Sequence, residues 1–301
     1  MSIRLLKTFL AVARHGTLAL AAQEIGLTQA AVSIQIHALE DTLRTQLFDR
    51  SRRSAKLNTA GRELVARAHE VVTLYENMAL GLKGGQIGGL LTLGASPPTL
   101  LWLLPDALLQ LQQRYPAVAV RVTTGLSSEL TLKVERGELD AALIAQPPFR
   151  LPHHLSWESI LAEPLVLLTP GKVKVTALRR TLTEFPFIGI NKQSWTGRLV
   201  QATLRRHHIA VDEVMELDSL ETIKGMVARG FGVSILPLHP SQWLEDKRVK
   251  IALLTPPTVR AIGLLQRAGN ARAQAIVALR ACLREQAVTT RTSARKLSLS
   301  D

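Results

Sequence analysis

The sequence predicts a mixed α/β protein built of three parts in chain order, and three observations support this prediction. Short helical segments separated by glycines come first, a long amphipathic helix follows, and alternating strands and helices fill the rest of the 301 residues. A chain of this length suits two or three compact units. We place the first part at 1–59, the linking helix and hinge at 60–89, and a two-lobed α/β domain at 90–301, with its first lobe at about 90–163 and 267–290 and its second at about 164–266.

The composition is that of a globular protein, with 47% hydrophobic and 20% charged residues. The net charge of +13 favours a polyanionic partner, but residues 1–85 hold only eleven Lys and Arg against seven Asp and Glu, so charge does not locate the contact. The single cysteine, Cys282, excludes an internal disulfide and fits a reducing compartment. The apolar patch at 9–13 is too short for a signal peptide, and no apolar run is long enough for a membrane span. We therefore expect a soluble, cytoplasmic protein with no membrane partner.

Three helices are expected in the first part, because apolar residues recur at helical spacing between breaks. The first begins near Ile3 and ends at Gly16, since glycine suits a helix stop. Thr17 can cap the second helix, which Gly26 ends. Thr28 is the expected N-cap of the third, because its hydroxyl can accept an otherwise unpaired backbone N–H.

The third helix has two distinct faces. A core stripe at i, i+4, i+7 and i+11 comprises Val32, Ile36, Leu39 and Leu43. A neighbouring face carries Gln29, Ala30, Ser33 and His37, with Ile34 at its edge. A short helix, a glycine-containing turn and an amphipathic helix form the helix-turn-helix pattern, whose second helix enters the major groove of DNA at its N-terminal end.

In that position Gln29 could pair with adenine, and Ser33 could bond a base edge or a phosphate. Composition and periodicity leave open a second interpretation, a three-helix structural cap whose polar face meets only water. The next segment favours the DNA role, because 47–50 and 56–59 read as a short hairpin around a basic turn. Such a wing can lay Arg52 and Arg53 along the sugar–phosphate backbone or into the minor groove.

Many positions in register over this segment carry a family resemblance. They are Phe9, Ala13, Gly16-Thr17, Ala21-Ala22, Leu27-Thr28-Gln29-Ala30-Ala31-Val32-Ser33, Gln35-Ile36, Leu39-Glu40, Leu47-Phe48-Asp49-Arg50, Arg53, Leu57 and Thr59-Ala60-Gly61. The segment resembles the winged helix-turn-helix of LysR-type transcriptional regulators. The resemblance implies a double-stranded DNA partner, with groove-facing or base-reading positions at Gln29, Ala30, Ser33 and Ile34. We take the DNA-binding set as Thr28, Gln29, Ala30, Ser33, Ile34, His37, Arg52 and Arg53.

The chain departs from the family pattern at four positions. Ala30 stands where proline is frequent, and Ile34 and His37 stand where a basic residue is common. This recognition face is therefore less cationic than usual, which is expected to lower its affinity for phosphate. Arg44 occupies a place where the family often has glycine, so a different end to the third helix is expected.

The linking helix is expected to begin at Thr59 as N-cap and to run to about Lys83, before a glycine-rich hinge at 84–89. A heptad seam along it comprises Leu64, Ala68, Val71, Tyr75, Met78 and Leu82. A monomer could bury this stripe on its own core, but its place between two domains favours dimerisation. The resemblance implies paired linker helices too, in a homodimer or a homotetramer built as a dimer of dimers.

The remainder alternates strands with helices, which favours parallel α/β sheets. In the first lobe we expect strands at 90–94, 118–122 and 139–145, with helices at 99–115 and 127–137. In the second we expect strands at 164–168, 187–190, 214–217, 232–237 and 261–265, with helices at 197–207 and 219–229. A last helix is expected at 271–286, followed by a solvated or disordered basic tail.

Two such lobes invite a ligand into the crevice at the carboxyl ends of their strands. Hydroxyls and backbone N–H groups at helix starts bind carboxylates and other anions well. The candidate effector-binding residues are Ser96, Thr99, Ser127, Ser128, Gln146, Ser194, Trp195 and Thr196. Each could instead simply cap a helix. As a set they resemble the effector pocket of LysR-type regulators, whose sensor halves resemble type 2 periplasmic binding proteins; 137–141 and 227–237 carry this second resemblance.

Three other classes of protein are disfavoured. The chain lacks the G-x-S-x-G, Walker A and H-E-x-x-H motifs, and the histidine pairs at 153–154 and 207–208 have no metal spacing, so we expect no enzyme, metal or cofactor. A solute-binding protein for transport would not explain the first 85 residues. A non-specific DNA-compacting protein would bind unrelated sequences equally. We therefore expect a sequence-specific transcription regulator that a small-molecule effector controls, with a small carboxylate as the suggested ligand of Ser96 and Ser127.

Overall fold

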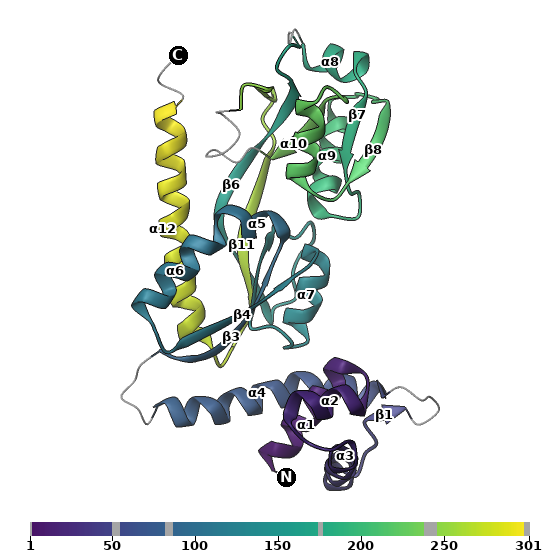
Figure 1. The fold of residues 1–301 in the computed structure, drawn as a ribbon, viewed down its shortest axis with the longest axis vertical. Coiled ribbons are helices and arrows are strands. Elements are labelled where there is room, and N and C mark those ends of the chain that lie inside the picture. The colour runs from purple at the N-terminus through teal and green to yellow at the C-terminus, as the bar shows by residue number, and fades with distance from the viewer. Residues whose placement is uncertain (1, 50–54, 82–86, 174–176, 238–245, 298–301) are drawn as a thin grey trace.

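The computed structural model describes residues 2–49, 55–81, 87–173, 177–237 and 246–297. Figure 1 shows a small helical unit at one end, the long helix α4 (Thr59–Gly81) beside it, and two α/β lobes stacked above. The helical unit, the first lobe and the second lobe each have their own hydrophobic core. Within the described ranges, no helix combines the length and apolarity needed to cross a bilayer.

The helical unit has the predicted order, with α1 at Ile3–His15, α2 at Leu18–Ile25 and α3 at Gln29–Leu43. The caps are as predicted. Gly16 and Gly26 adopt the left-handed conformation at φ 67°, and the hydroxyls of Thr17 and Thr28 accept hydrogen bonds from the backbone N–H groups of Leu20 and Ala31. Between these local signals, each helix buries one face in the core that the three helices share.

The end of α3 keeps the backbone shape that a glycine would favour, although no glycine is present. Arg44 is left-handed at φ 51°, and its N–H donates to the carbonyls of Glu40 and Asp41. The prediction that α3 ends differently from its glycine-containing relatives is therefore wrong. The turn is retained, although the left-handed conformation is sterically less favourable for arginine than for glycine.

The predicted hairpin is present as β1 (Phe48–Asp49) paired antiparallel with β2 (Lys56–Leu57). The buried carboxylate of Glu40 accepts a 2.7 Å hydrogen bond from the N–H of Leu47, which fixes the start of the hairpin to α3. The turn that contains Arg52 and Arg53 lies outside the described residues.

The linking helix begins one residue earlier than predicted. The side chain of Asn58, not Thr59, caps it by accepting a 2.8 Å hydrogen bond from the N–H of Gly61. Asparagine does this well because its short side chain returns to the first turn of the helix.

The heptad seam of α4 divides into a buried and an exposed half. Ala68 is fully buried and Leu64 half-buried, both against the core of their own helical unit, so they leave less surface for a partner than the exposed half of the seam. Val71 and Tyr75 are exposed, and so is Leu74 beside them. The side chain of Met78 and the whole of Leu82 lie outside the described part of the chain.

The first lobe contains a sheet with β3 (Gly89–Ala95), β4 (Val118–Thr124) and β5 (Ala141–Ala145) parallel to one another. The helices α5 (Pro97–Trp102), α6 (Leu104–Arg114) and α7 (Ser127–Glu135) belong to it. The segment predicted as a single helix at 99–115 is thus two helices. Pro105 lacks the N–H that a continuous helix would need at this position, but it is well suited to the first turn of a new helix, α6.

The second lobe is built on β7 (Phe187–Ile190), β8 (Glu213–Leu217), β9 (Ser234–Pro237) and β10 (Val249–Leu253). Its helices are α8 (Leu178–Glu184), α9 (Trp195–Arg206) and α10 (Leu220–Ala228). The sequence analysis missed α8 and β10. Only Val249 of β10 is buried.

Two long strands add antiparallel pairs to the sheets, for which the sequence favoured parallel pairing. They are β6 (Leu155–Pro170) and β11 (Val259–Arg267), which pair antiparallel with each other. Strand β11 also pairs antiparallel with β5, whereas β9 and β10 pair with the second half of β6. Ile262, Leu264 and Leu265 lie in the core of the first lobe, so β11 does not belong to the second lobe as predicted.

The last helix, α12 (Ala273–Leu297), packs on the first lobe and runs alongside both lobes in Figure 1. It continues past Gln286, so the prediction of an irregular tail directly after this residue is wrong. The thiol of Cys282 is buried in this packing, as expected, and burial raises its pKa.

His69 lies on α4 where this helix meets the first lobe. It lines two cavities there, one of about 30 Å³ with Asp140 and Arg267 and one of about 410 Å³ with Arg14 and Lys133. Burial, helped by the positive charges of Arg14 and Arg267, lowers the pKa of His69 from 6.5 to about 4. The imidazole is therefore neutral in the folded protein at pH 7.

This depressed pKa predicts a loss of stability in mild acid. The unfolded chain takes up a proton at His69 near pH 6.5 and the folded chain only near pH 4, so stability falls as the pH drops between these values, by at most about 1.4 kcal/mol for each pH unit. Urea unfolding at several pH values would measure this, and His69→Gln should flatten the dependence. The exposed His153→Gln should not; equal slopes in His69→Gln and the native chain would contradict the assignment.

Candidate functional site

The exposed face of α3 carries the residues predicted to meet DNA. Gln29 and Ala30 are exposed, Ser33 is half-buried, and Ile34 has 68% of its surface exposed. The opposite face is buried through Val32, Ile36 and Leu39. The side chain of Ile34 is thus accessible to another molecule, and a thymine methyl group is the kind of base-edge group that an apolar side chain contacts in DNA.

Two of the predicted DNA-binding residues also have partners within the protein. The hydroxyl of Thr28 caps α3, at 3.2 Å from the N–H of Ala31. The ring Nδ1 of His37 lies 3.7 Å from a carboxylate oxygen of Glu40. Since Glu40 also holds the N–H of Leu47, it joins the recognition helix to the hairpin.

The sequence analysis missed a second connection that orients α3. The hydroxyl of Thr8 on α1 donates a 2.6 Å hydrogen bond to the side-chain carbonyl of Gln35 on α3. A polar pair between otherwise apolar helix faces fixes the rotation of one helix against the other. In the sequence, the signal for this pair is a polar residue, Thr8, within an apolar stretch of α1. In the structure Thr8 is 1% exposed.

Between the two lobes lies a cleft with a cavity of about 380 Å³, a volume suited to a small metabolite. The first lobe contributes the residues that follow β3, β4 and β5, and the second contributes the loop before α9. Five of the eight predicted effector-binding residues line this cavity: Ser96, Ser127, Ser194, Trp195 and Thr196.

The other three predicted residues do not line the cleft. Thr99 is buried, and its hydroxyl donates to the carbonyl of Ser96, so it shapes the start of α5. Ser128 follows Ser127 on α7 but does not line this cavity, while Gln146 lines an adjoining cavity. The position of a residue after a strand does not decide which way its side chain points, so the sequence could not separate these three from the residues that line the cleft.

The cleft hydroxyls differ in what they can offer a ligand. Ser96 precedes α5 and makes no capping bond, and its hydroxyl has no hydrogen-bond partner among the described residues. The hydroxyl oxygen of Ser127 accepts a long bond, 3.3 Å, from the N–H of Ala145, which leaves its proton available. Ser194 has no proton left to donate: its hydroxyl donates to the carbonyl of Asn191 and accepts from the N–H of Gly197.

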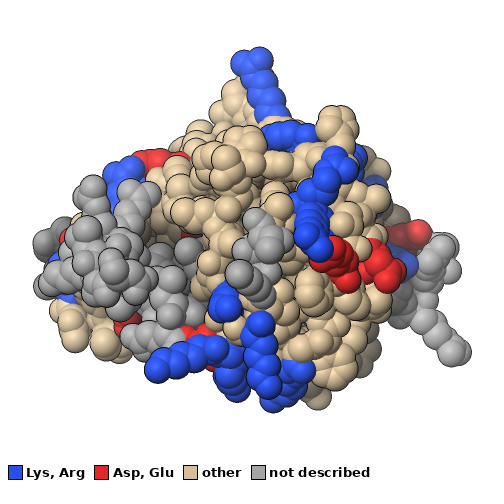
Figure 2. Space-filling view, turned by 90° about the horizontal axis from the view of Figure 1, so that it is seen from above, with Lys and Arg blue, Asp and Glu red and all other residues tan. Residues whose placement is uncertain are grey.

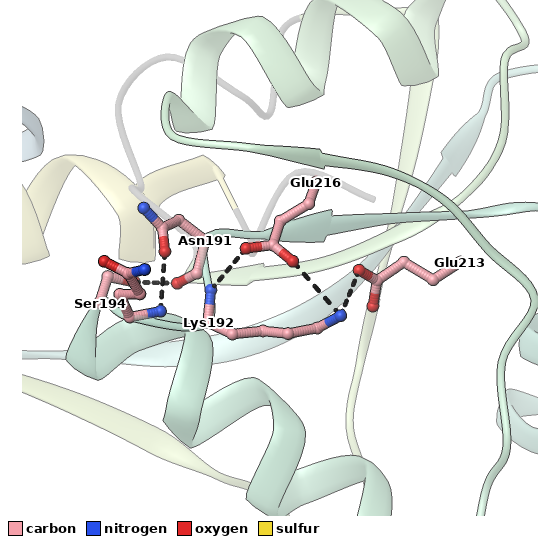
Figure 3. Close-up of polar contacts among 6 residues, drawn as sticks. Asn191, Lys192, Ser194, Glu213 and Glu216 are labelled. Carbon is pink, nitrogen blue, oxygen red and sulfur yellow. Dashed lines mark hydrogen bonds and ion pairs between the residues drawn. The ribbon is translucent and has the colours of Figure 1, made fainter.

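The loop before α9 is held rigidly to β8 (Figure 3). The amide of Asn191 donates to Asp218, and the ammonium of Lys192 lies 2.6 Å from Glu213 and 3.3 Å from Glu216. The N–H of Lys192 donates to Glu216 as well. The hydrogen bond to Glu213 raises the pKa of Lys192, which is therefore a structural cation rather than a free ligand group.

An arginine that the sequence analysis did not consider crosses the cleft. Arg260 is 5% exposed, and its Nε and Nη2 both donate to the buried carboxylate of Glu163, with the Nε bond at 2.9 Å. Its Nη1 donates to the hydroxyl of Thr196 at 3.1 Å, so it ties the two long strands to the start of α9. A charged residue inside the apolar strand at 259–265 was the available signal for a buried partner.

The chemistry of the cleft is that of binding by neutral polar groups. The hydroxyls of Ser96, Ser127 and Thr196 converge beside the indole of Trp195. Arg260 is already neutralised by Glu163, and the lining also contains Glu129 and Asp218. Among the described residues, no three His, Cys, Asp or Glu side chains gather where they could hold a metal ion.

Comparison with known proteins gives matches along nearly the whole chain. The family described as "Bacterial regulatory helix-turn-helix protein, lysR family" matches residues 3–62, and the "LysR substrate binding domain" matches 84–288. Curated relatives include the probable RuBisCO transcriptional regulators of Porphyra purpurea (31% identical, 78% of this chain and 76% of that protein covered) and Synechocystis sp. (29%, 86% and 81%).

Solved structures show the same fold. A full-length OxyR variant from Pseudomonas aeruginosa has a TM-score of 0.75 at 24% identity, with 94% of this chain and 95% of that one covered. CbnR in complex with its target DNA has a TM-score of 0.61 at 19% identity, with 95% and 100% covered. Because the two family matches follow each other in the order of the helical unit and the lobes, the chain belongs to the LysR family, as a DNA-binding transcription regulator with an effector-binding domain.

Proposed function

We propose that the exposed face of α3 reads the base sequence of an operator and that the cleft between the lobes binds the controlling effector, a small carboxylate. The observation that carries the proposal is the pair of separate sites. One is the exposed face of a helix held by Glu40 and Gln35, and the other is a cleft lined by the hydroxyl-bearing residues Ser96, Ser127 and Thr196. An effector that binds one arrangement of the lobes better than another would shift the equilibrium between them, and with it the spacing of the DNA-reading units.

Gln29 is the residue proposed to read a base pair directly. Its amide can donate to and accept from adenine at once, and it is exposed in the first turn of α3. Sheared genomic DNA recovered with the protein at about 0.15 M salt and sequenced should yield a few sites with dyad symmetry. Uniform recovery of all sequences would contradict sequence-specific reading.

Gln29→Ala is expected to cost about 1–3 kcal/mol at the one base pair that it contacts and to relax the preference there. Competition binding with operators changed one base pair at a time would measure this. Gln23→Ala is the matched control, since Gln23 is exposed on α2, outside the proposed base-reading face. Equal loss of affinity on every sequence in Gln29→Ala would assign Gln29 to backbone contact only.

Ser96 is the hydroxyl in the cleft proposed to bind the ligand carboxylate, because no described residue occupies it. Ligands can be found by a thermal-shift screen of small carboxylates, with stabilisation as the readout. Ser96→Ala is expected to weaken binding of such a ligand about tenfold, the value of one hydrogen bond to a charged group. Ser128→Ala, which removes a hydroxyl outside the cleft, should change nothing; unchanged affinity in Ser96→Ala would remove Ser96 from the site.

We infer further that the chain acts as an oligomer in the cytoplasm and by binding rather than by catalysis. The exposed Val71, Leu74 and Tyr75 on α4 support pairing with a second copy, which would present two recognition helices to two half-sites. A DNA ligand supports the cytoplasmic location, and membership of a family of transcription regulators supports the absence of catalysis. Sedimentation analysis of the full chain tests the first inference, and turnover of a bound ligand would contradict the last.

A further inference from the structure

A second and larger cavity lies beside the cleft, on the outer side of α9. Its volume is about 680 Å³. Its walls come from the loop after β5, from one face of α9 and from the first residues of β11. The described residues that line it are Ala145, Gln146, Pro147, Pro148, Phe149, Arg150, Trp195, Thr196, Arg198, Leu199, Ala202, Arg205, Val259, Arg260 and Ala261.

The charge of this cavity is wholly positive. Arg198 and Arg205 lie on one face of α9 at spacing i, i+7, and Arg150 comes from the opposing loop. No described lining residue is an aspartate or glutamate. None of the three arginines forms an ion pair within the described chain; Arg198 donates only to the backbone carbonyl of Gln193.

Some other surface cations, in the second lobe, do have carboxylate partners. Arg180 pairs with Glu184, Lys192 with Glu213, and Arg248 with Asp246. On the face of the molecule seen from the end of the second lobe, Lys and Arg side chains lie in several groups (Figure 2). Cations that line a concave surface with no compensating carboxylate create a positive potential inside it.

The rest of the lining is apolar. Phe149 meets Trp195 edge to face, with ring centroids 5.7 Å apart, yet 53% of its surface is exposed. Val259 is likewise 51% exposed, and Pro147 and Leu199 complete the wall. Apolar surface left open within a cavity gains free energy when a ligand covers it.

We propose that this cavity is a second ligand site, which binds an amphipathic polyanion: a small molecule with a doubly charged group such as phosphate attached to an apolar body. The guanidinium groups match phosphate oxygens in geometry and charge, and Phe149, Leu199 and Val259 cover the apolar body. The cleft suits a ligand of lower charge, since Glu129 and Asp218 line it and would repel a dianion more strongly than the single carboxylate proposed there. The site goes beyond the proposed function, which needs the cleft alone.

The test uses phenyl phosphate, which combines the two features, with the full chain in calorimetric titrations at about 0.15 M salt. Saturable binding to the native chain at micromolar to millimolar concentration is expected. Arg198→Gln and Arg205→Gln should each weaken it about tenfold, the value of one charge-assisted hydrogen bond. No binding in the millimolar range would overturn the proposal.

The matched control is Arg206→Gln, which removes the same charge from the next position of the same helix but does not line the cavity. It should change the affinity less than twofold; a loss equal to that of Arg205→Gln would reduce the effect to a diffuse positive field and overturn the site. Ser96→Ala should leave phenyl phosphate binding intact, and its loss there would assign the probe to the cleft. Equal binding of inorganic phosphate would overturn the apolar part of the proposal.

Discussion

Glu163→Gln is expected to lower the free energy of unfolding by about 3–5 kcal/mol, the usual cost of breaking a buried ion pair. Glu163 and Arg260 are 3% and 5% exposed, and the carboxylate accepts from two nitrogens of the guanidinium. Because arginine cannot lose its proton in a protein, the variant leaves a full positive charge buried with only neutral partners. Urea unfolding followed by tryptophan fluorescence would measure the loss.

Two further variants separate the cost of an unpaired charge from the value of the pair. Glu163→Leu combined with Arg260→Met should recover most of the stability, because an apolar pair of similar volume needs no solvation. Arg284→Gln removes one contact of the exposed pair with Glu158, at 53% side-chain exposure, and should cost less than about 1 kcal/mol. A double variant as unstable as Glu163→Gln would show that the pair itself stabilises the join between the lobes.

Gly197→Ala is expected to cost about 3 kcal/mol, at the upper end for overpacking, and to disturb the cleft. A Cβ at this position would lie 2.1 Å from the carbonyl oxygen of Asn191 and 2.9 Å from that of Ile190, both backbone atoms that cannot rotate away. The first turn of α9 would have to move from the loop that carries Ser194, and with it Trp195 and Thr196. Thermal unfolding and effector affinity would both report the change.

Gly225→Ala is the control for this substitution. Gly225 lies inside α10, and the only atom near its added Cβ is the far end of Arg229, at 3.4 Å. Alanine there should be neutral or stabilise the protein by about 0.5–1 kcal/mol, as is usual inside a helix. Equal effects of the two substitutions would contradict the role of close approach at Gly197.

The helical unit was predictable because its signals are local. Thr17, Thr28, Gly16 and Gly26 act on backbone groups within four residues of themselves, so the sequence is sufficient to place the end of α1, both ends of α2 and the start of α3. The buried stripe of α3 follows from helical periodicity in the same way. The capping role of Asn58 was missed because two adjacent residues can each cap a helix, and only the backbone path chooses between them.

The α/β half was predictable in its order of elements but not in its pairing. The first half of β6, at 155–163, alternates polar and apolar residues without a buried run, and it was missed. Its antiparallel pairing with β11 joins segments about a hundred residues apart, and no local pattern encodes the direction of such a pair. The same distance hid the bond between Arg260 and Glu163.

For the cleft, local sequence was sufficient to name five lining residues. The reason is that ligands bind at the carboxyl ends of strands in open α/β sheets, and polar residues that follow strands can be recognised in the sequence. It could not decide which of these hydroxyls is available. Ser96 and Ser194 look alike in the sequence, yet the hydroxyl of Ser96 has no partner among the described residues, whereas that of Ser194 already donates its proton to Asn191. That difference arises from tertiary packing, since a hydrogen bond forms only where folding brings donor and acceptor within about 3 Å of each other.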